Sequence, residues 1–280
     1  MGHSQQVSSG RPGREAVRER PSPVGPRARV ASALGAVSLA AMVVAQVASG
    51  LQARPITLTS VVVLLLAASA LAFACATHPP ARVATAFAAV VATGYAAEWI
   101  GIRTGLPFGD YHYTGVLWPA PGGVPVIVAL AWGGMGLAAH AVAAAVAPVS
   151  RAARIVTGAL ALTAWDLFLD PQMIRLGLWV WHDPGPYRGV PLGNFAGWLV
   201  VSLLVMALLE RVLAEPGAWS AGLVSIYTVM AVMETVGFAA VFVPPDPLVA
   251  TAGGLSMGLF ALLAWRRGRR SRPAPGAGRA

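Results

Sequence analysis

Eight long apolar stretches divide the body of this 280-residue chain, and they constrain its fold more than any other feature. A helix needs about 20 consecutive apolar residues to cross the hydrocarbon core of a bilayer. The stretches cover residues 30–50, 56–77, 81–103, 124–148, 152–172, 191–213, 219–243 and 248–265. The sequence therefore predicts an all-α, polytopic integral membrane protein with eight transmembrane helices, or seven if the short last stretch does not span the membrane.

Most of the basic residues are concentrated at the two ends of the chain. The 20 basic residues are all arginine, which excludes enzymes and retinal proteins that form a Schiff base with lysine. Residues 1–29 and 266–280 hold twelve arginines and two glutamates, a charge of +10, whereas the body between them carries −1, which together give the net charge of +9. A basic surface that could bind nucleic acid is therefore not predicted.

The tails also indicate domain organisation and orientation. Residues 1–28 and 267–280 are rich in proline, glycine, serine and arginine, and we expect them to be disordered tails around one transmembrane domain, residues 29–266. Arginine is enriched in cytoplasmic segments of membrane proteins. With the N-terminus inside, sixteen arginines lie on inner segments and four on outer ones. We expect a multi-pass protein of the plasma membrane with both termini in the cytoplasm. A cleaved signal peptide is the alternative, but the basic leader is long for one.

Two long connecting segments, 104–123 and 173–190, lie outside in this topology and are dense in aromatic residues, glycine and proline. Anchoring at the membrane interface explains such aromatic residues, but not the acidic residues that flank them. A disulfide framework is excluded because Cys75 is the only cysteine. The five histidines lack the spacing of membrane di-iron enzymes, and no glycine-rich nucleotide motif is present. The sequence predicts neither a metal nor an organic cofactor.

Four acidic residues fall within the predicted spans: Glu98, Asp166, Asp170 and Glu234. Ionisable groups inside a membrane are costly, so they are functional candidates by default. The third, fifth and seventh spans run in the same direction and place these acids in the outer half of the bilayer, near the aromatic segments. Asp166 and Asp170 are four residues apart, which puts their carboxyl groups on one helix face, about 6 Å apart.

Pro171 predicts that Asp170 is the last residue of its helix, because the residue before a proline disfavours helical geometry. The structural alternative for the acidic residues is that each forms an ion pair with an outer arginine: Arg103, Arg175 or Arg188.

Glu98-Trp-Ile-Gly101 and Glu234-Thr-Val-Gly237 share a weak pattern that a duplication of four helices would explain. Outside this pattern, Glu210 is expected to be solvated and Asp246 to lie in a turn.

These residues suit acid catalysis on an apolar substrate. A carboxyl group in a low-dielectric site can keep its proton at neutral pH and can protonate an alkene to a tertiary carbocation. Aromatic faces stabilise such a cation, and a second carboxylate can orient the attacking water. Asp166 is predicted to donate the proton because it lies one turn deeper than Asp170. Glu98 is predicted to hold the water, with Asp110 in reserve. The DxxxD spacing of Asp166 and Asp170 also occurs in intramembrane prenyltransferases, but the second motif of those enzymes is missing.

Several short motifs lie between residues 98 and 198. They are Glu98-Trp-Ile-Gly101, Thr104-Gly105, Pro107-Phe-Gly-Asp-Tyr-His-Tyr113, Gly123-Val-Pro125, Trp165-Asp-Leu-Phe-Leu-Asp-Pro-Gln-Met173, Trp179-Val-Trp181, Tyr187-Arg-Gly-Val-Pro191 and Asn194-Phe-Ala-Gly-Trp198. Together they resemble a membrane carotenoid-biosynthesis family that includes the bacterioruberin-type (CruF-like) carotenoid hydratases. The resemblance implies addition of water to the terminal double bond of a linear carotenoid end group without a cofactor, which is the reaction of a hydro-lyase.

The predicted site combines the acids with the aromatic residues around them. Its substrate-binding residues are expected to be Trp99, Phe108, Tyr111, Tyr113, Trp165, Trp179, Trp181, Tyr187, Asn194 and Trp198. A carotenoid end-group cyclase or isomerase is one alternative, and a small proton-coupled transporter is another. The expected partners are a linear carotenoid within the bilayer, lipid and other membrane enzymes of the carotenoid pathway.

Overall fold

A computed structural model describes residues 25–52, 55–213 and 219–270. The two tails lie almost entirely outside these residues, so their expected disorder stays a prediction. Arg54 also lies outside them, and its place on an outer segment stays a prediction. The helices are α1 (Pro26–Gly50), α2 (Ile56–Cys75), α3 (Pro80–Thr104), α4 (Val126–Val146), α5 (Arg151–Arg175), α6 (Leu192–Val212), α7 (Ala221–Val236) and α8 (Pro247–Arg270). A π-helical turn, η2 (Gly237–Val241), extends α7. In the described part of the chain, eight helices are long and apolar enough to cross a membrane, which confirms the predicted fold.

Local sequence signals explain where several helices begin. Proline has a backbone conformation that fits the first helical turn, where its missing N–H is not needed. Prolines accordingly start or directly precede six helices: Pro26, Pro55, Pro80, Pro125, Pro191 and Pro247. The other two signals are serine caps, at the starts of α5 and α7. Ser150 Oγ accepts from the Ala153 amide, and Ser220 Oγ accepts from the Leu223 amide.

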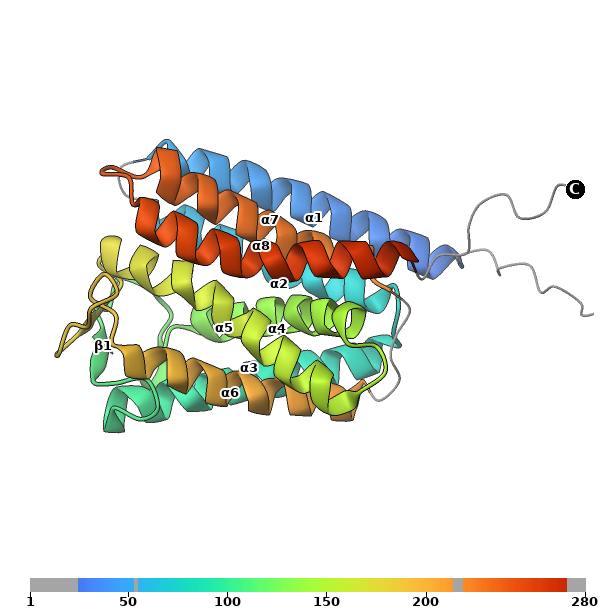
Figure 1. Cartoon of the computed structure of the whole chain (residues 1–280), viewed down its shortest axis with the longest axis horizontal. Helices are drawn as coiled ribbons and strands as arrows, with labels where there is room; N and C mark the ends of the chain where they lie inside the picture. The colour runs from blue at the N-terminus through green and yellow to red at the C-terminus, as the bar shows by residue number, and fades with distance from the viewer. Residues whose placement is uncertain (1–24, 53–54, 214–218, 271–280) are drawn as a thin grey trace, which may run out of the picture.

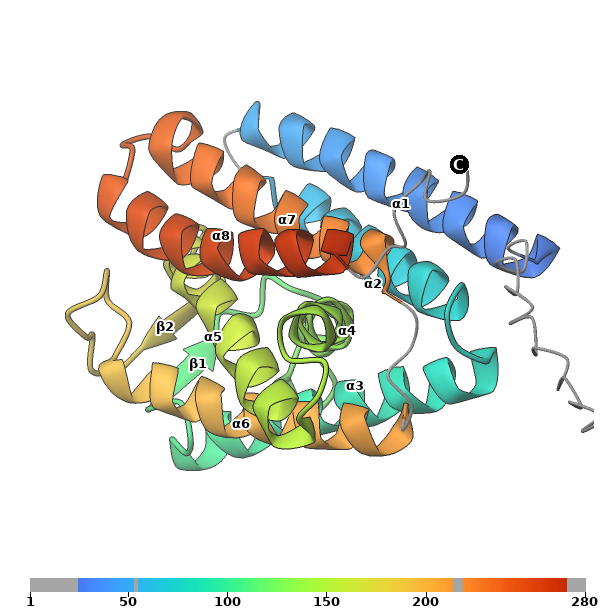
Figure 2. The same ribbon diagram turned by 45° about the vertical axis from the view of Figure 1, so that its right-hand side comes forward.

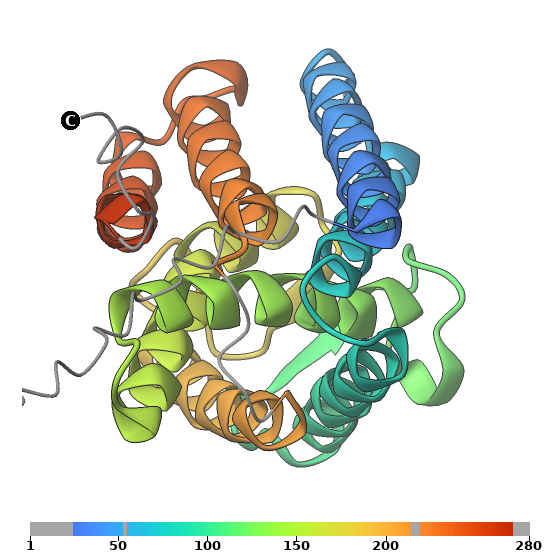
Figure 3. The same cartoon turned by 90° about the vertical axis from the view of Figure 1, so that its right-hand side faces the viewer.

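The helices surround α4, which crosses the bundle obliquely and is seen end-on in Figure 2 and lying across the view in Figure 3. It packs against α2, α3, α5, α6, α7 and α8, whereas α1 lies outside and packs mainly on α2. The N-terminal end of α1 and the C-terminal end of α8 lie at one end of the bundle, and the strand β1 (Tyr111–Tyr113) lies at the other (Figure 1). The bundle therefore has a terminal end and an end that carries both aromatic segments.

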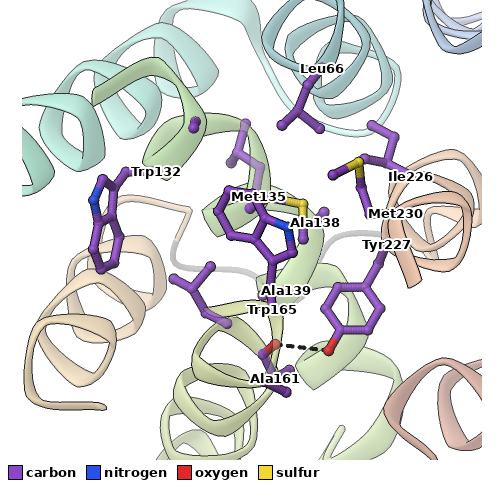
Figure 4. Packing of buried hydrophobic residues seen from close by; sticks show 14 of the residues in the cluster. Leu66, Trp132, Met135, Ala138, Ala139, Ala161, Trp165, Ile226, Tyr227 and Met230 are labelled. Carbon is purple, nitrogen blue, oxygen red and sulfur yellow. Dashed lines mark hydrogen bonds between the residues drawn. The ribbon is translucent and has the colours of Figure 1, made fainter. Parts of the chain in front are cut away.

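Small residues let α4 occupy the centre. A Cβ atom added to Gly134 would lie 2.8 Å from Leu66 of α2, and one added to Gly133 would lie 2.6 Å from Phe87 of α3. Such close approach of helices through small residues is typical of membrane bundles. Figure 4 shows the resulting packing, in which Tyr227 of α7 reaches toward α5 and donates to the Ala161 carbonyl oxygen at 2.8 Å.

Helix α5 does not end at Asp170. It continues through Pro171 to Arg175, so the predicted end was wrong. A proline within a helix leaves the carbonyl oxygen four residues earlier without its amide donor, and in membranes another group must replace that donor. Here the carbonyl is that of Leu167, and the Tyr187 hydroxyl donates to it at 2.9 Å. Burial raises the pKa of Tyr187 to about 12, so the hydroxyl keeps its proton at neutral pH.

Replacing Tyr187 with phenylalanine should destabilise the protein by about 1–3 kcal/mol, because the Leu167 carbonyl would lose its partner. The measurement is the thermal unfolding midpoint in detergent. Tyr95→Phe is a matched control, since the Tyr95 hydroxyl donates to the carbonyl oxygen of Pro121 in an exposed position. Equal midpoints for Tyr187→Phe and the wild type would show that the proline is accommodated in another way.

The terminal end contains an ion pair that sequence reasoning missed. Glu210, expected to be solvated, has a side chain only 7% exposed, and its carboxylate accepts from Arg154 at 2.7 Å and contacts His140 at 2.9 Å. The expectation was wrong because Arg154 and His140, distant in sequence, are brought to α6 by α5 and α4.

Asp246 lies in the turn before α8, as predicted, and also pairs with Arg188 at 2.6 Å and caps α8 through the Val249 amide. Partial burial raises the pKa of Asp246, but hydrogen bonds from Arg188 and the Val249 amide outweigh it and hold the pKa below its usual value. A carboxyl group with a lowered folded-state pKa stabilises the fold above its unfolded pKa of about 3.9, and this stabilisation is lost as the pH falls through the folded-state pKa.

We therefore expect the thermal unfolding midpoint to decrease when the pH is lowered below about 4. The decrease should be smaller in Asp246→Asn, which lacks this titrating group. Unfolding curves recorded between neutral and acidic pH measure both. An identical acid dependence in the two proteins would exclude Asp246 as its source.

Candidate active site

The two aromatic segments form one structure across the end of the bundle. Strand β1 pairs with β2 (Trp179–Trp181) in antiparallel register, with Tyr111 opposite Trp181 and Tyr113 opposite Trp179. Since alternate residues of a strand face opposite sides, these four aromatic side chains turn toward the helices, while His112 and Val180 are exposed. The segments therefore place four aromatic rings over the ends of α3, α5 and α6.

Glu98 lies beneath this small sheet and is only 6% exposed. Both Tyr111 and Tyr113 donate to its Oε2, the latter at 2.8 Å, and the Trp132 indole N–H donates to Oε1 at 3.1 Å. Burial and the nearby Glu98 carboxylate raise the pKa of both tyrosines, so both remain donors. Gly101 permits the contact, because a Cβ atom there would lie 2.9 Å from the Tyr111 hydroxyl. Three donors on one carboxylate are the arrangement that an ionised group requires.

Asp166 and Asp170 share one face of α5 and are buried, with exposures of 0% and 2%. The Asn194 amide nitrogen of α6 donates to Oδ2 of both carboxyl groups, and its distance to Asp166 is 2.8 Å. Two carboxyl groups that converge on a single amide donor cannot both be stabilised as anions in so apolar a setting. Glu98 thus accepts from three donors, whereas Asp166 and Asp170 share one.

Tryptophan rings form the apolar wall beside these acids. The rings of Trp132 and Trp198 stack with centroids 4.1 Å apart, and Trp165 meets Trp198 edge-on at 6.1 Å. Gly94 of α3 makes room for the Trp132 ring, because a Cβ atom there would lie 2.6 Å from it. Trp132 was not among the predicted site residues, since no motif on α4 distinguishes it from a core residue.

Two adjoining cavities lie between the acids and the tryptophans. The polar cavity, about 20 Å³, is lined by Glu98, Phe108, Tyr111, Tyr113, Val128, Leu169, Asp170, Trp179, Trp181, Asn194 and Trp198. The apolar cavity, about 50 Å³, is lined by Thr59, Val63, Leu117, Ile127, Val128, Ala131, Trp132, Trp165, Leu169, Met173, Trp179 and Trp198. Four residues, Val128, Leu169, Trp179 and Trp198, line both. The polar cavity is large enough for one water molecule.

The structure brings most of the predicted site residues to these cavities. Three others lie elsewhere: Trp99 is 42% exposed beneath the Arg103 guanidinium, Asp110 is exposed, and Tyr187 supports α5. Asp166 lies next to Asn194 but lines neither cavity. The face of α5 that the helical spacing predicted is therefore present, and Asp170 is its member that reaches the polar cavity.

The predicted alternative, in which the acids pair with outer arginines, is not observed. Arg103 donates to the carbonyl oxygens of Trp99 and Gly122, and Arg175 donates to that of Pro244. Arg188 pairs with Asp246. The buried acids of α3 and α5 thus face one another and aromatic rings.

A sequence model of the family described as "carotenoid biosynthesis protein" matches residues 59–259, which include every residue that lines the two cavities. The chain belongs to this family. A curated relative, the bisanhydrobacterioruberin hydratase of Haloarcula japonica, is 28% identical over 145 residues, which is 46% of this chain and 45% of the relative. The match therefore spans less than half the length of that relative. No solved structure matches the chain significantly. Membership of the family confirms the resemblance that the motifs indicated.

Proposed function

We propose that the protein hydrates the terminal double bond of a linear carotenoid end group without a cofactor, as a hydro-lyase. The observation that carries the proposal is the pair of cavities: a polar one that fits one water molecule adjoins an apolar one, and both are bordered by Trp179 and Trp198. A hydrocarbon end group in the apolar cavity would meet water across this border. The activity named for the curated relative supports the same reaction.

The contrast between the acids assigns their roles. Environments that differ strongly in hydrogen bonding separate an acid from a base. Glu98, with three donors, acts as the ionised base that holds the water. Asp170 lines the polar cavity and shares a single donor with Asp166, so it is the acid that protonates the alkene. Asp166 and Asn194 position Asp170.

The Asp170 proton adds to the less substituted alkene carbon, and the alkene electron pair forms the new C–H bond, which leaves a tertiary cation. The faces of Trp179 and Trp198 stabilise that cation. The water oxygen bonds to the cation while Glu98 takes one water proton, and proton return from Glu98 to Asp170 restores both groups. The net change is the addition of one water molecule.

Expression in a host that accumulates lycopene tests the function. Mass spectrometry of the pigment extract should show a product heavier than lycopene by one water molecule for each end that reacts, with the hydroxyl on a tertiary carbon. A host with the empty vector is the control. A new pigment of unchanged mass would instead indicate the cyclase or isomerase, and an unchanged pigment at confirmed expression would contradict the proposal.

We propose that the end with the aromatic segments faces the outside of the plasma membrane, because the arginine distribution places both termini in the cytoplasm. In a Cys75→Ala background, Val116→Cys should react with an impermeant maleimide in intact cells, since Val116 is 45% exposed at that end. Val149→Cys, 96% exposed at the terminal end, should react only after permeabilisation. The reverse pattern would invert the topology.

A further inference from the structure

Another buried carboxyl group lies on the opposite side of α5 from the reaction site. Glu234 of α7 is 7% exposed and lines a cavity of about 200 Å³, here called the Glu234 cavity. Gln172 lines it from α5, two residues beyond Asp170. Residues two apart on a helix point about 200° apart, so the polar cavity and the Glu234 cavity occupy opposite faces of α5.

Two polar side chains of this cavity, Glu234 and Gln46, have oxygen atoms without a partner among the described residues. No hydrogen bond or ion pair forms at the Glu234 carboxyl group within the described part of the chain. Gln46 of α1 donates through Nε2 to the Met230 sulfur at 3.5 Å, but its Oε1 is buried without a partner. Buried polar atoms are almost always hydrogen-bonded. Gln46 Oε1 therefore lacks the bond that a buried amide oxygen requires, and the Glu234 carboxyl group meets the cavity instead of a protein donor. A ligand or solvent in the cavity can supply both bonds.

The two Glu-x-x-Gly motifs show why Glu98 has hydrogen-bond donors and Glu234 has none within the residues that the structure describes. In each motif the glycine admits an aromatic ring: a Cβ atom at Gly101 would lie 2.9 Å from the Tyr111 hydroxyl, and one at Gly237 would lie 3.2 Å from Phe242. Tyr111 donates to Glu98, whereas Phe242 has no donor. A π-helical turn, a feature frequent at functional sites, begins at Gly237, three residues after Glu234. The second site has the acid and the ring but no internal hydrogen bond.

We propose that the Glu234 cavity binds the hydroxyl-bearing end of an apolar isoprenoid, the class of molecule that the proposed hydration produces. Its walls include Val47, Met233, Val241 and Phe242, which suit a branched hydrocarbon end. A cavity of roughly 150 Å³ accommodates benzene in another protein, so this one has room for such an end. One hydroxyl donates to Gln46 Oε1 and accepts from Glu234 in its neutral form. A hydrocarbon would leave both groups without partners. The choice of an alcohol rests on the proposed function.

Binding to purified protein in phosphatidylcholine nanodiscs tests the site. The probes are a labelled linear C20 isoprenoid with a terminal tertiary alcohol and the alkene of the same skeleton. We expect the alcohol to bind at least about tenfold more tightly than the alkene, since a site built around a hydroxyl rejects the analogue that lacks it. Glu234→Met and Gln46→Leu should each remove this preference, while Glu234→Gln, which can still donate and accept, should retain it.

Three results would overturn the proposal. Alcohol binding that Glu234→Met leaves unchanged would place the ligand elsewhere, and loss of binding in Glu234→Gln would show that the carboxyl group itself is required, not a hydrogen-bond donor and acceptor. Displacement of the alcohol by phosphatidylglycerol would assign the cavity to a lipid headgroup. The hydration assay separates this proposal from the proposed function. Glu234→Met should still hydrate carotenoid, and the binding measurement does not require turnover.

Discussion

Asp170→Asn is expected to lower carotenoid hydration by about 100-fold or more, the scale of a lost general acid. A carboxamide keeps the size and the polar contact with Asn194 but cannot protonate an alkene. Asp170 is the acid of α5 that lines the polar cavity, so no other group on that helix is placed to replace it. Product yield at matched protein level, measured in the lycopene-producing host, is the readout.

Asp166→Asn is the matched comparison. Reasoning from depth alone predicted Asp166 as the proton donor, whereas the cavity favours Asp170. Asp166→Asn should therefore reduce the hydration yield less than Asp170→Asn, because Asp166 only positions Asp170 through the shared donor Asn194. If Asp166→Asn were the more severe variant and Asp170→Asn remained active, the order predicted from depth would be correct.

Glu98→Gln should also reduce hydration by about 100-fold or more while leaving a folded protein. The glutamine oxygen can still accept from Tyr111 and Tyr113, but its amide nitrogen cannot accept from Trp132 or take a proton from water. Without Glu98 to activate water, the cation can return a proton from a neighbouring carbon to the Asp170 carboxylate, so an isomerised alkene of unchanged mass is the expected by-product.

Tyr113→Phe provides a graded control for Glu98→Gln, because it removes one of the three donors and leaves the carboxylate. It should retain a measurable part of the hydration yield. Thermal midpoints should be recorded for both variants. Full hydration by Glu98→Gln would remove Glu98 from the mechanism, and Asp110→Asn would then be the next variant to measure.

The helices and the acidic face of α5 could be predicted from sequence because both depend on local spacing. The eight apolar stretches correspond to α1 through α8, and the four-residue spacing of Asp166 and Asp170 puts both carboxyl groups on Asn194. The end of α5 could not be predicted, since its continuation past Pro171 depends on Tyr187, which lies in another segment. A proline inside a membrane helix is tolerated where another group replaces the lost donor, and here that group is the Tyr187 hydroxyl.

Long-range contacts also decided the rest of the site. Trp132 reads as one apolar residue among many on α4, and only the packing of α4 on α3 brings its indole N–H to Glu98. Glu210 appears solvated beside Arg211, yet it is paired by residues of two other helices. The motif match located the right segments, but it could not distinguish Asp170, which lines a cavity, from Asp110, which is exposed.

The division of hydrogen bonds along the chain bears on how the protein enters the membrane. Every donor to Glu98 belongs to β1 or α4, so this carboxylate is satisfied once the first four helices are in place. The acids of α5 have their donor in α6, the next helix to be made. During synthesis, therefore, each buried acid of the reaction site finds its hydrogen-bond donors no later than the next helix to be made.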